Sequence, residues 1–308
     1  MRIAFLFSGQ GTQYPGMMRD LADANDDVRK IFDTADNVLG RKISTLCFEG
    51  TQEELNLTHN TQPCVLAADL AVYAAVTALG VRPAAVAGFS LGEYAALVAA
   101  GVVPLEKVFP IVQKRADLMQ DAVPIGDGAM AAVMKLTEAE VTALCAEVDG
   151  YIAPANYNCP GQIVVSGETK AIDQMLELAK ARKIRAGKLL VSAPFHCKMM
   201  RPAADGLRPL LERLGMKAPA IPVYMNVDAM PETEPDKLLA KLVLQAMSPV
   251  RWEDTLRNMY ADGIDTFVEL GPGDTLSKFV EKTLKGEAKA FHVTDLETLN
   301  ITIKALKE

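Results

Sequence analysis

The sequence predicts an α/β protein whose main domain contains a parallel β-sheet with helices on both faces. Three stretches support this class: an apolar strand followed by a glycine turn at residues 3–13, a strand–turn–helix unit at residues 84–100, and alternating strands and helices after residue 220. At 308 residues, the chain is long enough to bury a sizeable core as one large domain or two modest ones.

Composition narrows the classes of function. The formal net charge of −7 argues against a nucleic-acid-binding protein. The five cysteines are odd in number and contain no C-x-x-C pair, so they are expected to be reduced thiols in a cytosolic protein and not a disulfide frame or metal site. The N-terminus lacks the layout of a signal peptide, and no apolar run approaches the length of a membrane span. We therefore expect a cytoplasmic protein that binds no membrane and no metal.

The first strand, residues 3–7, runs directly into the turn Ser8-Gly9-Gln10-Gly11. A glycine turn after a first strand is also typical of dinucleotide-binding loops. That fingerprint needs a glycine at position 14, where this chain has Tyr14, and no Walker lysine follows. The alternative is that Gly9 and Gly11 let the backbone N–H of Gln10 approach a reaction centre and donate to an oxyanion.

Polar helices are expected over residues 19–58, followed by an apolar helix that Pro63 opens and that runs from about residue 64 to 79. The strand 84–87 then leads into Gly88-Phe89-Ser90-Leu91-Gly92, and an alanine-rich helix follows. The form Gly-x-Ser-x-Gly between a strand and a helix is a nucleophile elbow, whose glycines let the strand and helix backbones pass close together. The turn predicts that Ser90 is a nucleophile near free backbone N–H groups.

The next helix ends near residue 121 and carries Arg115 on its apolar face, three residues after Val112 and three before Leu118. A cation in that position must snorkel to solvent, form a structural ion pair, or meet an anion that binds there. Spacing alone leaves these alternatives open.

Residues 125–192 differ in pattern from the rest of the chain. Strands near 129–134, 151–156, 162–166 and 188–191 alternate with helices near 137–148 and 170–181. The order β-α-β-β-α-β is that of a ferredoxin-like unit. We therefore expect a small subdomain at 125–192 inserted into a main domain formed by 1–124 and 193–308. The turn 156–161 between its middle strands either faces the active site or is only a polar hairpin.

A serine nucleophile needs a base, and the chain has three histidines. His196 follows a strand and a proline turn and precedes a helix, whereas His59 lies in a polar stretch and His292 lies near the C-terminal end. Elimination and context therefore favour His196 as the base. Downstream, strands at 221–225 and 266–270 alternate with helices 235–247 and from 252 onward, and the second strand ends in Gly271-Pro272-Gly273.

These motifs together resemble the malonyl-CoA:acyl carrier protein transacylase family over essentially the whole chain. They are Gly9-Gln10-Gly11-Thr12-Gln13, Gly88-Phe89-Ser90-Leu91-Gly92-Glu93, Arg115, Asn158-x-Pro160-Gly161-Gln162, Pro194-Phe195-His196, Gln245 ahead of Ser248-Pro249-Val250-Arg251-Trp252, and Glu269-Leu270-Gly271-Pro272-Gly273. The resemblance implies an α/β-hydrolase-like large subdomain, a ferredoxin-like small one, and an active site in the cleft between them.

The resemblance also implies a role for each site residue. Ser90 would be the nucleophile and His196 the base. The backbone N–H groups of Gln10 and Leu91 would form the oxyanion hole, and the main-chain carbonyl of Gln245 would orient His196. Substrate binding would fall to Arg115, which would bind the malonyl carboxylate, together with Phe195 and Asn158. Phe195 resembles the residue of malonyl-selective enzymes, in which a bulky ring would crowd an α-methyl group.

The implied reaction is transfer of malonyl from malonyl-CoA, through a malonyl-serine ester, to the phosphopantetheine thiol of an acyl carrier protein. No cofactor is expected beyond the coenzyme A thioester substrate. The alternatives are a stand-alone acyltransferase of a polyketide pathway, a serine esterase or thioesterase, and a non-catalytic docking subunit.

The chain departs from the family at Phe89, where a histidine usually precedes the serine. A basic cluster at Lys180, Arg182, Lys183, Arg185 and Lys188 is a candidate docking surface for an acidic carrier protein. It is equally consistent with an ordinary solvated helix end.

Overall fold

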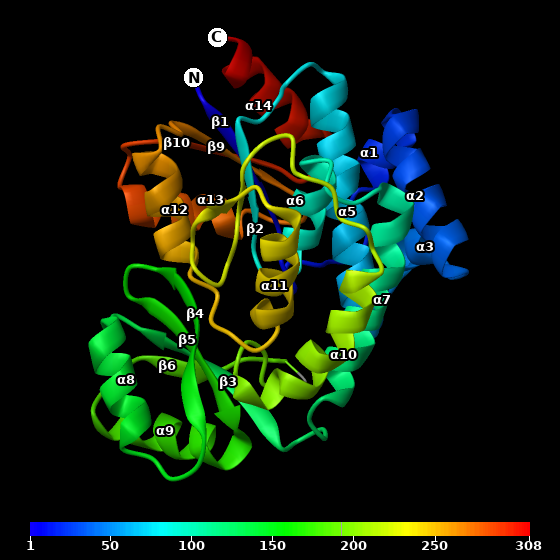
Figure 1. Cartoon of the computed structure of the whole chain (residues 1–308). Helices are drawn as coiled ribbons and strands as arrows, with labels where there is room; N and C mark the ends of the chain where they lie inside the picture. Colours follow the sequence, from blue (N-terminus) through cyan, green and yellow to red (C-terminus); the bar gives the residue numbers. More distant parts are fainter. Residues whose placement is uncertain (192) are drawn as a thin grey trace.

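The computed structural model describes residues 1–191 and 193–308 and consists of a large and a small subdomain, each built on its own sheet (Figure 1). Both termini lie at the far end of the large subdomain from the small one. Ser192, the last residue of the predicted insert, lies outside the described residues, so the predicted domain boundaries stay predictions.

The large sheet has six strands in the order β10-β9-β1-β2-β7-β8. The first five are parallel, and β8 pairs antiparallel with β7 at the edge. Phe5, in the middle of β1, lies opposite Val86 of β2 and Val268 of β9. The strands are β1 (Ile3–Phe7), β2 (Ala85–Gly88), β7 (Val223–Tyr224), β8 (Pro231–Glu232), β9 (Thr266–Leu270) and β10 (Lys289–Val293).

Helices cover both faces of this sheet, as the sequence predicts. Phe5 and Phe7 point into a core with α2, α5, α6, α7 and α10, while Ala4 and Leu6 point into a second core with α12 and α13. The helices are α1 (Arg19–Ala24), α2 (Asp26–Leu39), α3 (Ile43–Glu49), α4 (Gln52–Leu55), α5 (Thr58–Ala78), α6 (Gly92–Ala99), α7 (Leu105–Asp121), α10 (Arg201–Glu212), α11 (Pro235–Gln245), α12 (Trp252–Ala261), α13 (Thr275–Leu284) and α14 (Leu296–Lys307), with a 3₁₀ turn η1 (Lys198–Met200).

Helix α5 corrects two expectations. It begins at Thr58, so Pro63 lies inside the helix and does not open it. Pro63 cannot donate to the carbonyl of His59, and that carbonyl instead accepts hydrogen bonds from Arg41 and Gln113, both at 3.2 Å. With 21 residues, α5 is also long and apolar enough to cross a membrane by length and composition. However, 78% of its most apolar window is buried inside the protein, so it is a core helix.

The small subdomain has the predicted β-α-β-β-α-β order. Its antiparallel sheet runs β4-β5-β3-β6, with both helices packed on it. Its elements are β3 (Gly128–Met134), α8 (Glu138–Ala146), β4 (Ile152–Cys159), β5 (Gln162–Glu168), α9 (Thr169–Ala181) and β6 (Ala186–Lys188). The last strand therefore begins and ends earlier than the predicted 188–191. Leu189 and Val191, which the prediction placed in the strand, line the cavity described below.

Strand β4 joins the two subdomains. Val250, just before α12, donates to the carbonyl of Ala155 and accepts from the N–H of Tyr157, both at 2.9 Å. The strand also bulges twice against β5, which re-aims its side chains. Residues predicted as a hairpin turn from position 156 thus continue the strand to Cys159, and the turn itself is Pro160-Gly161.

Candidate active site

Ser90 occupies the sharp turn between β2 and α6. Its φ is +53°, a left-handed conformation that a non-glycine residue adopts only under constraint. A Cβ on Gly88 would lie 1.9 Å from the backbone carbon of Gly92, and a Cβ on Gly92 would lie 2.3 Å from the carbonyl oxygen of Phe7. The two motif glycines are therefore required by the close passage of strand, turn and helix, as an elbow demands.

Asn226, which the sequence analysis did not single out, holds the elbow in place. Its Oδ1 accepts from the N–H of Ser90 at 2.7 Å, and its Nδ2 donates to the carbonyl of Gly88 at 2.8 Å. The side chain is fully buried. One amide thus fixes the backbone on both sides of Phe89 and offsets the cost of the strained Ser90 conformation.

His196 lies within hydrogen-bond distance of the serine hydroxyl. Its Nε2 is 2.7 Å from Ser90 Oγ, and its Nδ1 is 2.9 Å from the main-chain carbonyl of Gln245. Because a carbonyl can only accept, Nδ1 carries the proton and Nε2 is free to accept from the hydroxyl. The chain thus has a serine–histidine pair whose third member is a backbone carbonyl and not a carboxylate.

The environment of His196 keeps the imidazole neutral. Burial lowers its pKa to about 4, and the nearby positive charge of Arg115 acts in the same direction. A histidine that is neutral at neutral pH is competent to accept a proton from Ser90. Like Ser90, it has a left-handed backbone, with φ +60°.

Arg115 is 1% exposed and reaches the same hydroxyl from α7. Its Nη2 donates to Ser90 Oγ at 3.1 Å and to Gln245 Oε1 at 3.0 Å, and its Nη1 donates to Gln62 Oε1 at 2.7 Å. The ring of Tyr94 lies 5.5 Å from the guanidinium carbon. Burial lowers the pKa of Arg115. The snorkelling alternative is wrong, and none of the ion pairs recorded among residues 1–191 and 193–308 includes Arg115.

Gln245, at the end of α11, connects these groups. Its Nε2 donates to the carbonyl of Ser90 at 2.6 Å and to Glu93 Oε2 at 2.7 Å. Glu93 is fully buried, and its other oxygen accepts from the N–H of Asn226. Burial raises the pKa of Glu93 to about 8, while the hydrogen bonds from Asn226 and Gln245 and the charge of Arg115 lower it.

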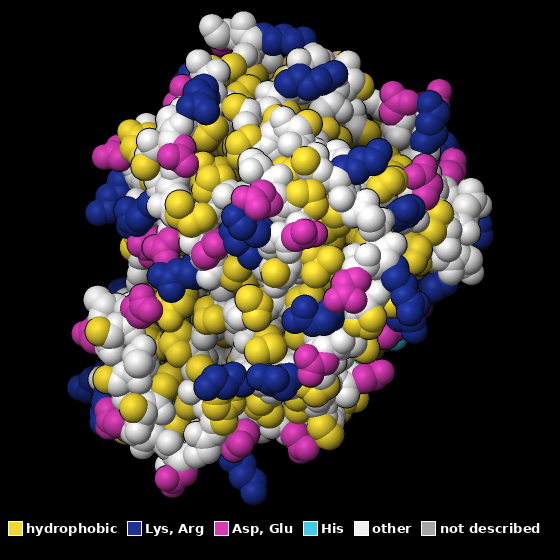
Figure 2. Space-filling model, in the orientation of Figure 1, with side chains coloured by type: hydrophobic (Ala, Val, Ile, Leu, Met, Phe, Trp, Pro, Cys, Tyr) yellow, Lys and Arg dark blue, Asp and Glu magenta, His cyan; other side chains and the backbone are white. Residues whose placement is uncertain are grey.

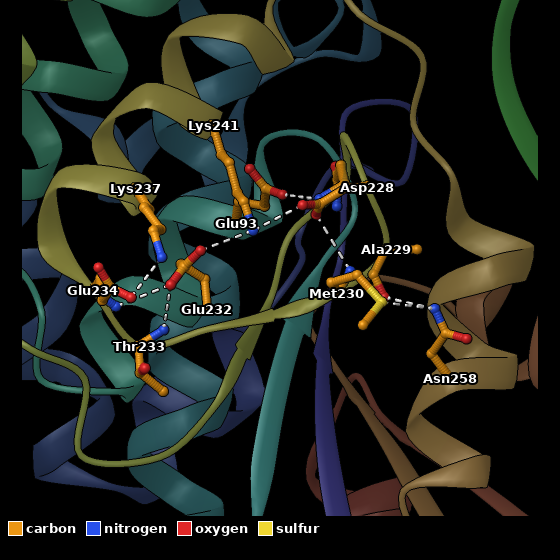
Figure 3. A network of polar contacts seen from close by, with 11 residues as sticks. Glu93, Asp228, Ala229, Met230, Glu232, Thr233, Glu234, Lys237, Lys241 and Asn258 are labelled. Carbon is orange, nitrogen blue, oxygen red and sulfur yellow. Dashed lines mark hydrogen bonds and ion pairs between the residues drawn. The ribbon is translucent and has the colours of Figure 1, made fainter.

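An ion-pair network anchors the loop and helix that carry Asn226 and Gln245. Lys241 of α11 contacts Asp228 at 2.8 Å and Glu232 at 2.9 Å. Figure 3 shows Lys241 between these two carboxylates, with Glu93 of α6 pointing toward the same loop.

The glycine turn after β1 packs directly on the elbow. A Cβ on Gly9 would lie 2.8 Å from the carbonyl oxygen of Phe89, so only glycine fits there. Gly11 has open space around it and is needed instead for its φ of +105°, which corrects the expectation that it too permits close approach. No backbone acceptor is recorded for the N–H groups of Gln10 and Leu91 within the described part of the chain, which leaves both groups available to an oxyanion.

A cavity of about 250 Å³ opens over Ser90, between the two subdomains. Phe195 is 7% exposed and lines it, as do Asn156 and Asn158 from β4. Asn156 and Asn158, from the segment predicted as a polar turn at 156–161, therefore face the cavity, whereas Pro160 and Gly161 of the turn itself line a separate pocket. Met119, Met130, Ala132, Val164, Leu189 and Val191 supply apolar lining.

Phe89 also lines the cavity and belongs to an aromatic cluster. Its ring centroid is 5.4 Å from that of Trp252 and 6.5 Å from that of Phe279. The residue that departs from the family pattern thus forms an apolar wall beside Ser90.

The structure brings Ser90, His196, Arg115, Gln10, Phe195, Asn158 and Gln245 to one site, with Leu91 at the start of α6 beside it. His59 is exposed on α5 and His292 lies in edge strand β10, and neither lines the cavity. Sequence reasoning missed Gln62, Asn226 and Glu93 as contributors. Only Glu93 lies within a motif that could have signalled it.

Comparison with known proteins extends this picture. Residues 4–301 match the acyl transferase domain family. The chain is 43% identical to the malonyl CoA-acyl carrier protein transacylase of Bacillus subtilis, covering 100% of this chain and 98% of that protein. It is 40% identical to the protein of the same name from Escherichia coli K12, covering 91% and 92% of the two chains.

Solved structures give the same result for the fold. The malonyl CoA-acyl carrier protein transacylase of Coxiella burnetii superposes with a TM-score of 0.96 at 37% identity, covering 100% of this chain and 98% of the other. A malonyl-transacylase in complex with a type II PKS acyl-carrier protein superposes with a TM-score of 0.96 at 38% identity, covering 99% and 100%.

Proposed function

The chain belongs to the acyl transferase family, and we propose that it transfers a malonyl group from malonyl-CoA to the phosphopantetheine thiol of an acyl carrier protein. The single observation that carries this proposal is the buried Arg115, whose guanidinium contacts the same hydroxyl oxygen as His196. A carboxylated acyl group on Ser90 meets a cation there, and an uncharged one does not.

The first half-reaction acylates the enzyme. His196 Nε2 takes the proton of Ser90 Oγ as the oxygen attacks the thioester carbonyl carbon. The carbonyl oxygen becomes an oxyanion, which the N–H groups of Gln10 and Leu91 stabilise. The carbon–sulfur bond then breaks, and His196 returns the proton to the departing coenzyme A thiolate.

The second half-reaction reverses these roles. His196 takes the proton of the phosphopantetheine thiol, the sulfur attacks the malonyl-serine ester, and Ser90 leaves and regains a proton from His196. Gln245 holds the imidazole in the required tautomer through both steps. The acyl group enters activated as a thioester, so the proposed chemistry uses no cofactor.

The small, mostly apolar cavity supports malonyl selectivity. Phe195 and Asn158 both line the cavity. In the proposed function the Phe195 ring would crowd a substituent on the α-carbon, and Asn158 would offer an amide to the acyl chain or pantetheine arm. We assign the protein to the cytoplasm, because its five cysteines are all free and buried and α5, which is long and apolar enough to cross a membrane, is a core helix.

The acceptor is proposed to be the carrier protein of fatty acid synthesis. A second candidate is the carrier of a polyketide pathway, favoured by the likeness to the malonyl-transacylase solved with a type II PKS carrier. Steady-state transfer of radiolabelled malonate from malonyl-CoA to each purified holo-carrier tests both. Transfer with a higher kcat/KM to the fatty-acid carrier supports the first candidate, a higher value for the polyketide carrier supports the second, and release of free malonate without transfer supports an esterase.

A further inference from the structure

Glu93 directly follows the elbow Gly88-Phe89-Ser90-Leu91-Gly92 and has no role in the reaction described above. It lies in the first turn of α6 and is fully buried. The N–H of Asn226 donates to its Oε1, and Gln245 Nε2 donates to its Oε2 at 2.7 Å. Both carboxylate oxygens therefore receive a donor.

Glu93 and the carbonyl of Ser90 together fix which way the Gln245 amide faces. With Nε2 directed at Glu93 and at the carbonyl of Ser90, Oε1 is left to accept from Arg115 Nη2 at 3.0 Å. An uncharged partner that offered an N–H in place of an acceptor would favour the opposite orientation, with Nε2 turned toward the guanidinium. The carboxylate thus controls an acceptor of Arg115 without touching it.

The hydrogen bonds recorded for Arg115 within the described residues all go to neutral acceptors: the hydroxyl of Ser90 and the amide oxygens of Gln62 and Gln245. A buried cation without any counter-charge is costly. A carboxylate bonded directly to the guanidinium would offset that cost, but it would also occupy the donors that an acyl carboxylate needs. Glu93 lies one amide away: it is linked to Arg115 through the side chain of Gln245 and leaves the guanidinium without a directly bonded carboxylate.

We propose that Glu93 is a positioning residue that, through the side chain of Gln245, holds Arg115 toward the acyl group and thereby sets the preference for carboxylated over uncharged acyl-CoA. This inference rests on the proposed function, because it concerns how the same site selects its substrate.

The direct test is Glu93→Gln, which keeps the size of the side chain and replaces one acceptor by a donor. Acylation of Ser90 is followed by rapid quench and intact mass with malonyl-CoA and, separately, acetyl-CoA. We expect kcat/KM for malonyl-CoA to fall about tenfold or more and that for acetyl-CoA to change by less than about threefold, because only malonate uses the Arg115 fork. Equal losses for the two substrates, or no loss, would overturn the inference.

Glu269→Gln is the matched control. Glu269 is another fully buried carboxylate; its Oε2 accepts from the N–H of Ser277 at 2.8 Å, and its recorded hydrogen bonds do not include Gln245 or Arg115. We expect it to lose stability and keep the wild-type ratio of malonyl to acetyl acylation. A shift in that ratio as large as that of Glu93→Gln would assign the effect to general loosening of the core.

Gln245→Met covers the case in which Glu93→Gln does not fold. It keeps the main-chain carbonyl for His196 and removes the amide that links Glu93 to Arg115. The same selective loss of malonyl acylation is expected, and an unchanged ratio contradicts the inference. Failure of the wild-type enzyme to transfer malonate at all would instead contradict the proposed function, so the two failures are distinguishable.

Discussion

Arg115 donates from Nη2 to the hydroxyl oxygen of Ser90 across 3.1 Å, and both residues line one cavity. The cation is therefore positioned to recognise whatever charged group the serine carries, and it also lowers the pKa of the histidine that activates the serine. Substrate recognition and base strength are coupled through this one side chain.

Arg115→Ala should lower malonyl acylation by about a hundredfold or more, because two charge-assisted hydrogen bonds to the acyl carboxylate are lost. Acetyl acylation should hold or rise, since the penalty of leaving the guanidinium unpaired is removed. Arg115→Lys should recover little, because a point charge cannot form the fork. Acylation rates with both thioesters measure this. If both fall by the same factor, Arg115 is a structural residue and selectivity comes from elsewhere.

The pH dependence of acylation should reflect a histidine with a pKa of about 4. The neutral form of His196 is the active base, so the single-turnover rate should stay constant from pH 7 down to about 5 and fall toward pH 4. Because burial lowers this pKa, the folded protein also binds fewer protons than the unfolded chain between about pH 6.5 and 4, so His196 makes folding less favourable as pH falls through that window. A rate midpoint near 6.5 would mean that the imidazole is solvated in the working enzyme.

Asn226→Asp should impair catalysis with either thioester. The new carboxylate can still accept from the N–H of Ser90, but it repels the carbonyl of Gly88. The elbow therefore loses one of the two hydrogen bonds that Asn226 makes to it. We expect kcat to fall about tenfold or more with little change in KM, and the free energy of unfolding to fall by about 1–3 kcal/mol. Asn258→Asp is the control, because Asn258 donates to Ala229 in the same loop at 3.0 Å without contacting the elbow. An equal loss of kcat in Asn258→Asp would show that the effect of Asn226→Asp does not come from its hydrogen bonds to the elbow.

The basic cluster at the end of α9 gives a prediction about the carrier protein. Arg182 is bound by Glu147 and Lys188 by Asp173, whereas the ion pairs recorded for the described residues include none at Lys183 or Arg185, both of which are exposed. Figure 2 shows acidic and basic side chains interspersed over the face in view. A cluster of positively charged side chains is therefore confined to a small area of the protein surface. Charge reversal at Lys183 and Arg185 should raise KM for the carrier and leave KM for malonyl-CoA unchanged, with an effect that shrinks in salt. Equal effects on both KM values would contradict docking there.

The fold class and the central pair of site residues could be predicted because their signals are local. Gly88 and Gly92 flank Ser90 in five residues, and the order of elements in the small subdomain predicts its antiparallel sheet. Asn226 and Gln62 could not be predicted in this way, since each is an amide brought to the site from another element by packing alone.

Two predicted boundaries of secondary-structure elements are wrong, at positions where contacts with distant residues outweigh the local sequence pattern. Pro63 lies inside α5, and Arg41 and Gln113 bond the carbonyl of His59 that it leaves without a helical partner. Likewise, the composition of residues 188–191 favours a strand, but β6 ends at Lys188, and Leu189 and Val191 lie beyond it and line the cavity over Ser90.

The most direct test of the central claim is the intact mass of the protein after mixing with malonyl-CoA, before and after addition of holo-carrier protein. Wild type should gain one malonyl group, keep it in the absence of carrier, and lose it to the carrier thiol, while Ser90→Ala should gain none. A malonyl adduct that persists on the Ser90→Ala protein, or a wild-type adduct that water removes as fast as the carrier does, would contradict transfer through Ser90.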